Sequence, residues 1–186
     1  RIAFIPETIG AISYIYKNLE ILKSRIVAGY HLTCVGGPGS YSYVCSRQGN
    51  ALVDRVSQHI LQHELLPCAP QIQDYTQRGS DERQFCSPGV DLPVGTLSKT
   101  KFENYREYHT SLDNLKYVTA EHLEKSFSIY TRCLDALENN RKYSAALHCE
   151  PKLGDRGLWP TIGGKAYQDQ NVHDQLALLA YSDGEH

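Results

Sequence analysis

The chain of 186 residues lacks the features that would direct it to a membrane or to nucleic acid. No apolar run approaches the ~18 residues that a membrane-spanning helix requires, and no signal-peptide pattern stands at the beginning. The formal net charge is only −2, so the composition does not favour a nucleic-acid or membrane surface as the main partner. We therefore expect no membrane-spanning helix within this sequence, and nucleic-acid binding receives no support from the composition.

Close cysteine pairs are also missing. The six cysteines contain no CxxC spacing, which excludes a cysteine zinc knuckle and disfavours a disulfide scaffold. We predict reduced thiols in an intracellular, cytoplasmic protein. The cysteines are Cys34, Cys45, Cys68, Cys86, Cys133 and Cys149.

Methionine is absent altogether, and the chain opens directly on an apolar run at residues 1–5 that is typical of a buried strand. It closes on a polar turn at residues 183–186. We interpret the sequence as an internal fragment of a longer protein. Part of any functional site would then lie outside it.

Hydrophobic periodicity predicts strands that alternate with helices, which is typical of an α/β layered fold with a largely parallel sheet. Strands are expected at residues 1–5, 26–35, 41–46 and 92–97. Helices are expected after Pro6, over residues 51–65 and after Thr119, which would cap the last one. Their predicted inward stripes are Ile12, Tyr16, Leu19 and Leu22; Leu52, Val56 and Ile60; and Leu123, Phe127, Tyr130, Leu134 and Leu137.

The character of the sequence changes after about Arg141, where glycine and proline become frequent. A short apolar helix is expected at residues 173–181. We therefore predict an α/β domain over residues 1–144, followed by a linker and the beginning of a second module over residues 145–186.

Two polar loops contain the residue types of a zinc site, in which carboxylate oxygens and imidazole nitrogens share the metal. Asp81 lies in the loop 78–93 before an apolar strand, and Arg78 or Arg83 could hold the acid beside it. The alternative for Asp81 is a capped helical turn with a local ion pair.

His109 lies in the second polar loop, and Asp113 follows four residues later. A metal-bound imidazole needs an acceptor for its other nitrogen, and Asp113 could serve. The alternative is a surface histidine, with Asp113 as a turn residue.

Glu7 stands where a predicted strand ends and a helix begins, at the edge of a parallel sheet where active sites gather. The alternative is a carboxylate that the helix dipole stabilises in the first turn.

Two weaker patterns favour a structural role over a functional one. His59 and His63 have helical i, i+4 spacing but lack the glutamate of HExxH, and residues 36–39 (GGPG) are typical of a hairpin turn.

Three segments in a characteristic order resemble the C-terminal half of the zinc aminopeptidase-like fold. They are IPETIG at residues 5–10, SDERQF at 80–85 with Gly89 and Leu92-Pro93 after it, and HTSLD at 109–113. The resemblance is to a bacterial aminopeptidase-like family, often linked to polysaccharide biosynthesis loci, in which a winged helix follows. It implies a three-layer αβα sandwich of the zinc-exopeptidase type, and residues 173–181 resemble the start of a truncated winged-helix module.

By position, the resemblance implies that Asp81 and His109 are zinc ligands and that Glu7 is the general base. Thr8 occupies the position of a second, ligating glutamate in relatives, which implies one zinc ion or a weakened second site. Glu82 stands where relatives often have histidine, and it could itself reach the metal.

The family's remaining ligands, a histidine and an aspartate, are expected upstream of Arg1. The segment alone is therefore expected to be inactive.

Two functions stay open. The first is a zinc-dependent aminopeptidase-like hydrolase that acts on a peptide or an amino-amide small molecule. The second is a non-catalytic scaffold or regulatory protein of a polysaccharide biosynthesis pathway, which Thr8 mildly favours. The tail is too short and too weakly basic to support DNA binding, and a homo-oligomer stays open.

Overall fold

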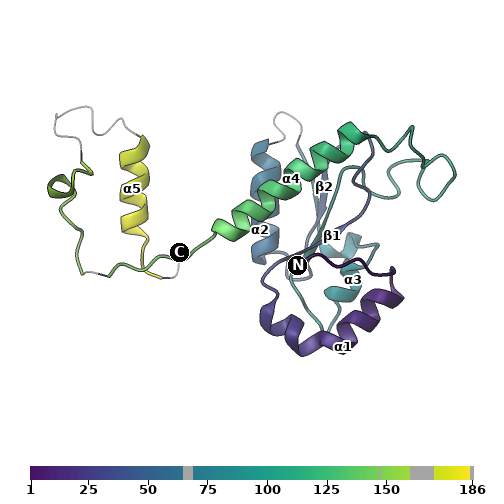
Figure 1. Cartoon of the computed structure of the whole chain (residues 1–186), viewed down its shortest axis with the longest axis horizontal. Helices are drawn as coiled ribbons and strands as arrows, with labels where there is room; N and C mark the ends of the chain where they lie inside the picture. Colours follow the sequence, from purple (N-terminus) through teal and green to yellow (C-terminus); the bar gives the residue numbers. More distant parts are fainter. Residues whose placement is uncertain (65–68, 147, 160–169, 185–186) are drawn as a thin grey trace. The chain divides into compact units, whose positions relative to one another are not determined.

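The computed structural model describes residues 1–64, 69–146, 148–159 and 170–184 (Figure 1). It divides into two compact units, Arg1–Asn139 and Asn140–His186. The first unit has an α/β fold, which confirms the predicted class. Its elements are α1 (Ile9–Arg25), β1 (Gly29–Leu32), β2 (Ser42–Val44), α2 (Leu52–Glu64), β3 (Gln71–Gln73), η1 (Tyr75–Gln77), α3 (Glu82–Phe85), β4 (Val94–Ser98) and α4 (Ala120–Asn139).

The four strands form one sheet in the order β1-β4-β2-β3. β1 pairs with β4 and β2 with β3 in parallel, whereas β2 and β4 are antiparallel, so the prediction of a mostly parallel sheet is confirmed. The predicted hairpin at residues 36–39 is wrong, because β4 lies between β1 and β2. The glycines instead let this loop approach Thr100, whose hydroxyl accepts a 2.9 Å hydrogen bond from Gly39 N.

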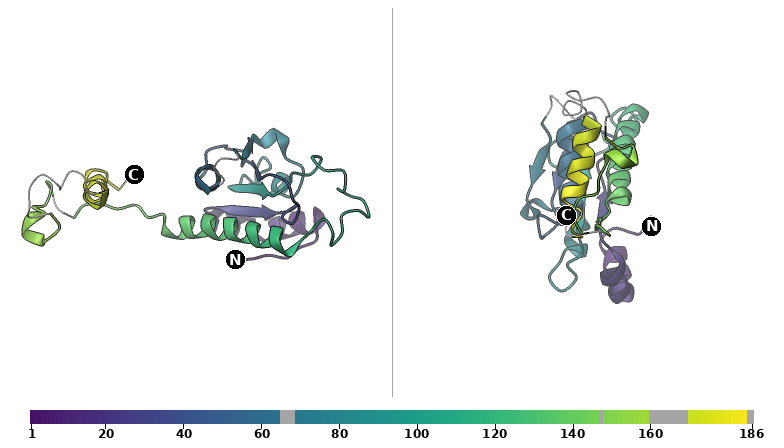
Figure 2. Two further views of the ribbon diagram at one scale, coloured as in Figure 1. Left: turned by 90° about the horizontal axis from the view of Figure 1, so that it is seen from above. Right: turned by 90° about the vertical axis from the view of Figure 1, so that its left-hand side faces the viewer.

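Helices cover both faces of the sheet. Val94 and Leu97 are three positions apart on β4, so their side chains point to opposite faces. Leu97 packs in a core with Tyr43 of β2, Leu61 of α2 and Ile129 of α4, and α4 runs alongside the sheet (Figure 2).

The second core lies on the opposite face. Val94 packs there with Ile15 and Leu22 of α1, and with Cys86 and Leu92 of the segment after α3. The two cores give the three αβα layers that the resemblance implies.

A buried carboxylate joins the start of α2 to the sheet. Asp54 is fully buried and accepts hydrogen bonds from Tyr43 Oη, from the backbone and hydroxyl of Ser46, and from Ala51 N, at 2.6–2.9 Å. An unpaired buried carboxylate would be costly, so these donors make its burial tolerable. Tyr43 reaches Asp54 by crossing Gly95, where no side chain stands in its way.

The predicted apolar stripes of two helices are confirmed only in part, since Leu22 of α1 and Tyr130 of α4 are buried as predicted but other members are exposed. In α1 the buried side chains include Ala11 and Ile15, whereas Tyr16 is 86% exposed. In α4 they include Ile129 and Cys133, whereas Phe127 is 73% exposed. Both helices have apolar residues on more than one side, so periodicity alone could not select the side that meets the sheet.

The predicted first strand is wrong, because residues 1–5 form no strand and Ile2 and Phe4 are largely exposed. A strand needs a neighbour for its backbone hydrogen bonds, and none of the described strands pairs with this segment. The predicted helix cap is confirmed, since Thr119 Oγ1 accepts a hydrogen bond from His122 N at 3.3 Å.

The second unit contains η2 (Gly154–Arg156) and α5 (Gln170–Ala180), which overlaps the helix predicted at residues 173–181. A bridge between Ser144 and Asp183 ties its two ends together. Throughout the described ranges, no helix is both long and apolar enough to span a membrane. The five cysteines in those ranges are free thiols, while Cys68 lies outside the described residues.

Candidate functional site

Two segments that are far apart in sequence meet at the beginning of α1. Thr8 N donates a 2.9 Å hydrogen bond to Asp81 Oδ1, and Ser80 Oγ lies 3.3 Å from Glu7 Oε1, to which it donates. Arg83 Nη2 also donates to Thr8 Oγ1, at 3.4 Å. The structure therefore brings Glu7 and Asp81 to one place, as neighbours through Thr8 and Ser80.

Glu7 and Asp81 differ in their surroundings. The Glu7 residue is exposed, whereas Asp81 is only 4% exposed and is held by a backbone donor. Thr8 between them has a φ of 59°, which is rare for a β-branched residue. Such strained backbone is common at functional sites, where the surrounding contacts over-determine it.

Glu82 is the deepest acid of the cluster and is fully buried. Its Oε1 accepts hydrogen bonds from Gly79 N at 2.7 Å and from Ser80 N at 3.1 Å. Its Oε2 lies 3.7 Å from Nδ1 of His31, and neither of these two atoms has a hydrogen-bond partner. Glu82 thus fixes the loop that presents Ser80 and Asp81.

His31 is a residue of this cluster that the sequence interpretation missed. It lies on β1, and its Nε2 is 3.5 Å from Ser80 Oγ. The available signal was its position next to the carboxyl end of a strand that pairs in parallel, where polar side chains of α/β proteins meet a site.

His109 lies in a different setting from Asp81. It is exposed, has a φ of 57°, and stacks on Tyr108 with the ring centroids 3.9 Å apart. The structure contains no hydrogen bond or ion pair between His109 and either Asp81 or Asp113. Burial raises the pKa of the neighbouring Tyr108, and the charges of Cys34 and Glu7 add smaller contributions.

The side chains of the cluster are of the kinds that bind zinc, but too few of them are arranged around one common point. Carboxylate oxygens of Asp81 and Glu82 and the imidazole of His31 are zinc-type ligands. Within the described ranges, however, no three histidine, cysteine, aspartate or glutamate side chains are arranged to hold a metal ion. The orphaned Glu82 Oε2 and His31 Nδ1 are the two buried atoms of the cluster that still lack a partner.

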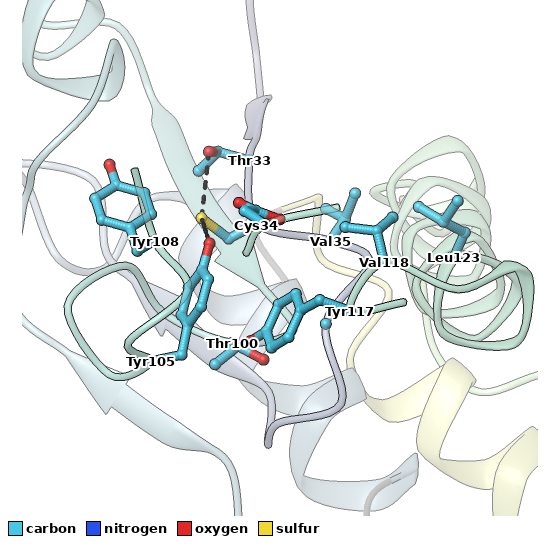
Figure 3. Close-up of a pocket in the computed structure, with 12 residues that line it drawn as sticks. Thr33, Cys34, Val35, Thr100, Tyr105, Tyr108, Tyr117, Val118 and Leu123 are labelled. Carbon is cyan, nitrogen blue, oxygen red and sulfur yellow. Dashed lines mark hydrogen bonds between the residues drawn. The ribbon is translucent and has the colours of Figure 1, made fainter. Parts of the chain in front are cut away.

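A cavity of about 270 Å³ is lined in part by the loop that contains His109 (Figure 3). Tyr105, Tyr108 and Tyr117 line it together with Cys34 and Asp113. Tyr105 Oη lies 3.5 Å from Cys34 Sγ, to which it donates. Asp113, which sequence reasoning placed beside His109, therefore lines this cavity.

Comparison with known families gives two matches along the chain. Residues 1–140 match a family described as a domain of unknown function (DUF4910), and residues 141–186 match one described as a winged helix-turn-helix. A curated protein of Clostridium acetobutylicum, provisionally named as a polysaccharide biosynthesis protein with an aminopeptidase-like domain, is 38% identical over 187 residues. The alignment covers 99% of this chain but 42% of that protein, so the chain spans less than half of its relative's length.

Two solved structures have a similar fold. A crystal structure from Clostridium acetobutylicum at 2.37 Å, provisionally named a peptidase, matches with a TM-score of 0.78 and 35% identity, over 97% of this chain and 39% of that one. The aminopeptidase from Aneurinibacillus sp. strain AM-1 matches with a TM-score of 0.56 and 20% identity, over 69% of this chain and 30% of that one. The second likeness concerns the fold alone. Together, the comparisons confirm the resemblance to aminopeptidase-like proteins.

Proposed function

The chain belongs to the family described as a domain of unknown function (DUF4910), and on that premise we propose that it is part of a zinc-dependent, aminopeptidase-like hydrolase. One observation carries the proposal: Glu7 and Asp81 meet at one site through the contacts Thr8–Asp81 and Glu7–Ser80, each of which joins residues 73 positions apart in the sequence. An exposed carboxylate next to a buried, fixed one suits two roles, since the first can exchange protons and the second can hold a ligand.

Glu7 is the proposed general base. Its carboxylate is open to solvent and receives a hydrogen bond from Ser80 Oγ, which orients one oxygen and leaves the other for a proton. It would take a proton from the attacking water and deliver it to the leaving amine. Removal of such a base typically costs about 10²–10⁴-fold in rate.

Asp81 and His109 are the proposed zinc ligands. Thr8 N holds one oxygen of Asp81, which leaves Oδ2 for a metal, and the exposed imidazole of His109 has no hydrogen bond that ties up its nitrogens in the described structure. Further ligands, a histidine and an aspartate, would come from sequence upstream of Arg1 in a polypeptide as long as the relatives. Zinc, when bound, supplies a Lewis acid that polarises a carbonyl and acidifies water.

Glu82 and His31 are proposed to position the site and not to bind the first metal ion. Two backbone N–H groups occupy one oxygen of Glu82, and its full burial keeps it below the surface of the cluster. Arg83 donates a hydrogen bond to the hydroxyl group of Thr8, and this contact supports the strained backbone between Glu7 and α1.

The substrate would be a peptide or an amino amide. The free thiols fit the cytoplasmic location that the cysteine spacing predicts.

A second function has one specific observation in its favour. The resemblance implies that Thr8 occupies the position of a ligating glutamate, and in this structure the Thr8 hydroxyl contacts Arg83. A threonine is a poor zinc ligand, so a scaffold that keeps the fold without the chemistry is the alternative. The name of the curated relative suggests a polysaccharide biosynthesis pathway for it.

Zinc content per chain separates the two functions. We would measure it by elemental analysis in the full-length protein and in its Asp81→Ala and Asp135→Ala variants, the latter being an exposed acid on α4. Zinc that is lost in Asp81→Ala and kept in Asp135→Ala supports the hydrolase. Absence of zinc from the unchanged protein, after growth with added zinc, would leave the scaffold as the function.

A further inference from the structure

The cavity beside Tyr105 has two chemically different ends. Figure 3 shows Tyr105 and Tyr108 on one side of Cys34, and Val118 and Leu123 on the other. The first end contains tyrosine rings and hydroxyl groups, and the second contains branched aliphatic side chains. A ligand that fits the cavity needs a polar head and a short apolar tail.

The aromatic end is built from rings that hold one another in place. Tyr105 stacks on Tyr117 with centroids 4.9 Å apart and an interplanar angle of 10°, and it meets Tyr108 edge-on at 5.6 Å. Packed rings of this kind present fixed electron-rich surfaces, which attract a cation.

The charge of the lining has one sign. Asp113, which is exposed, lines the cavity, and the described residues that line it include no lysine, arginine or histidine. Burial raises the pKa of both Tyr105 and Tyr117, and the negative charge of Asp113 raises each further. Burial, the larger cause, opposes an ion of either sign, whereas the smaller contribution from the negative charge of Asp113 favours a cation over an anion.

From these features we infer that the cavity binds a small primary alkylammonium ion, with the ammonium group among the tyrosines and Asp113, and the alkyl chain against Val118 and Leu123. Its volume of about 270 Å³ lies at the small end for ligand sites, which suits a short amine. Hydroxyl oxygens of Thr33 and Thr100 in the lining can accept hydrogen bonds from a primary ammonium group. This inference stands apart from the proposed hydrolysis, because it concerns binding without a metal.

Three small molecules of similar size and shape but different charge test the inference on the wild-type protein. We would titrate the intact, metal-free protein with n-butylammonium, n-butanol and butyrate by calorimetry, at equal ionic strength. We expect n-butylammonium to bind about tenfold more tightly than n-butanol, the difference that a partly desolvated cation–π contact gives, and butyrate to bind most weakly. Equal or tighter binding of n-butanol, or no saturable binding of n-butylammonium at millimolar concentration, would overturn it.

Two matched variants locate the binding. Asp113→Asn should weaken n-butylammonium binding by about two- to fivefold, because an exposed carboxylate contributes modestly, and it should leave n-butanol binding unchanged. Asp135→Asn, which removes the same charge from an exposed position outside the cavity, should change neither. An equal effect of the two substitutions, or none from Asp113→Asn, would place the amine elsewhere and refute the assignment.

Discussion

Thr8 N donates a 2.9 Å hydrogen bond to Asp81 Oδ1 and so joins the beginning of α1 to the loop before α3. This contact uses the backbone of Thr8 and would survive many changes of its side chain. It fixes one oxygen of a carboxylate that is otherwise almost wholly buried. The candidate site therefore depends on chain geometry at Thr8 more than on the identity of that residue.

The role of Glu7 leads to the first prediction. In the full-length protein, Glu7→Gln should keep bound zinc and lower kcat for an amino-acyl amide by about 10²–10⁴-fold, because an amide side chain accepts no proton at neutral pH. Glu20→Gln changes an exposed glutamate on α1, the helix that follows Glu7, and serves as the control. Wild-type kcat in Glu7→Gln would remove Glu7 from the mechanism.

The orphaned atoms of Glu82 and His31 lead to the second prediction. Glu82→Gln keeps the Oε1 acceptor for Gly79 N and Ser80 N, and its new amide group can donate toward His31 Nδ1. It should therefore change the free energy of unfolding by less than about 1 kcal/mol. Glu82→Ala removes the acceptor of both N–H groups and leaves that of the buried Ser80 unpaired, so it should cost about 1–3 kcal/mol.

Urea unfolding of the two variants provides the measurement. A Glu82→Gln variant as unstable as Glu82→Ala would show that the negative charge, and not the acceptor geometry, holds the loop. Circular dichroism of each variant at zero urea verifies that both still fold.

Sequence reasoning reached the fold class and part of the candidate site for a definable reason. The alternation of strands and helices follows from the period of the hydrophobic residues. This period can be identified in the sequence without knowing which segments are neighbours in the fold. Glu7 and Asp81 do lie close together, but the strand expected before Glu7 does not form, so only the helix beginning after Glu7 agrees with that reasoning. Neither inference requires a side-chain orientation.

The parts that sequence reasoning missed depend on tertiary contacts. Which face of α4 is buried is decided by the sheet, so Ile129 is covered while Phe127 is not. His31 joins the cluster through its contacts with Ser80 and Glu82, and its place near the carboxyl end of β1 is a weak signal that does not specify those partners. The stacking of His109 on Tyr108 likewise arises from the conformation of a loop that has no regular period.

The third prediction concerns the pH dependence of the free energy of unfolding and rests on two buried thiols. Burial raises the pKa of Cys45 and of Cys133 from 9.0 to about 11. The folded protein keeps these protons between pH 9 and 11 while the unfolded chain loses them. The stability they contribute is therefore complete below pH 9 and is lost as the pH rises through 11, at a rate of at most about 1.4 kcal/mol per pH unit for each thiol.

Between pH 9 and 10 the unfolded tyrosines, with a pKa near 10, ionise in part as well, so a comparison with a variant that lacks both thiols is needed to isolate their effect. We expect the urea midpoint to fall across this window, and to fall less in a variant with both Cys45→Ala and Cys133→Ala. Equal slopes in the two proteins would contradict the prediction. At pH 8 the exposed Cys149 should react with a thiol reagent well before either buried cysteine.

The crossing of Tyr43 over Gly95 leads to the last prediction. A Cβ at position 95 would lie 2.0 Å from the Tyr43 hydroxyl oxygen and 2.5 Å from its ring carbon, so Gly95→Ala must displace Tyr43. The displacement would break the 2.9 Å hydrogen bond from Tyr43 to Asp54 and should cost about 2–4 kcal/mol of unfolding free energy.

A double-mutant cycle with Tyr43→Leu tests the cause. Tyr43→Leu removes the ring that the new methyl group would meet, so Gly95→Ala should cost clearly less in that background than in the wild type. Gly154→Ala, where an added Cβ has no atom within 4 Å, provides the control and should be nearly neutral. Additive costs for Gly95→Ala and Tyr43→Leu would show that the sheet requires the glycine for a reason other than Tyr43.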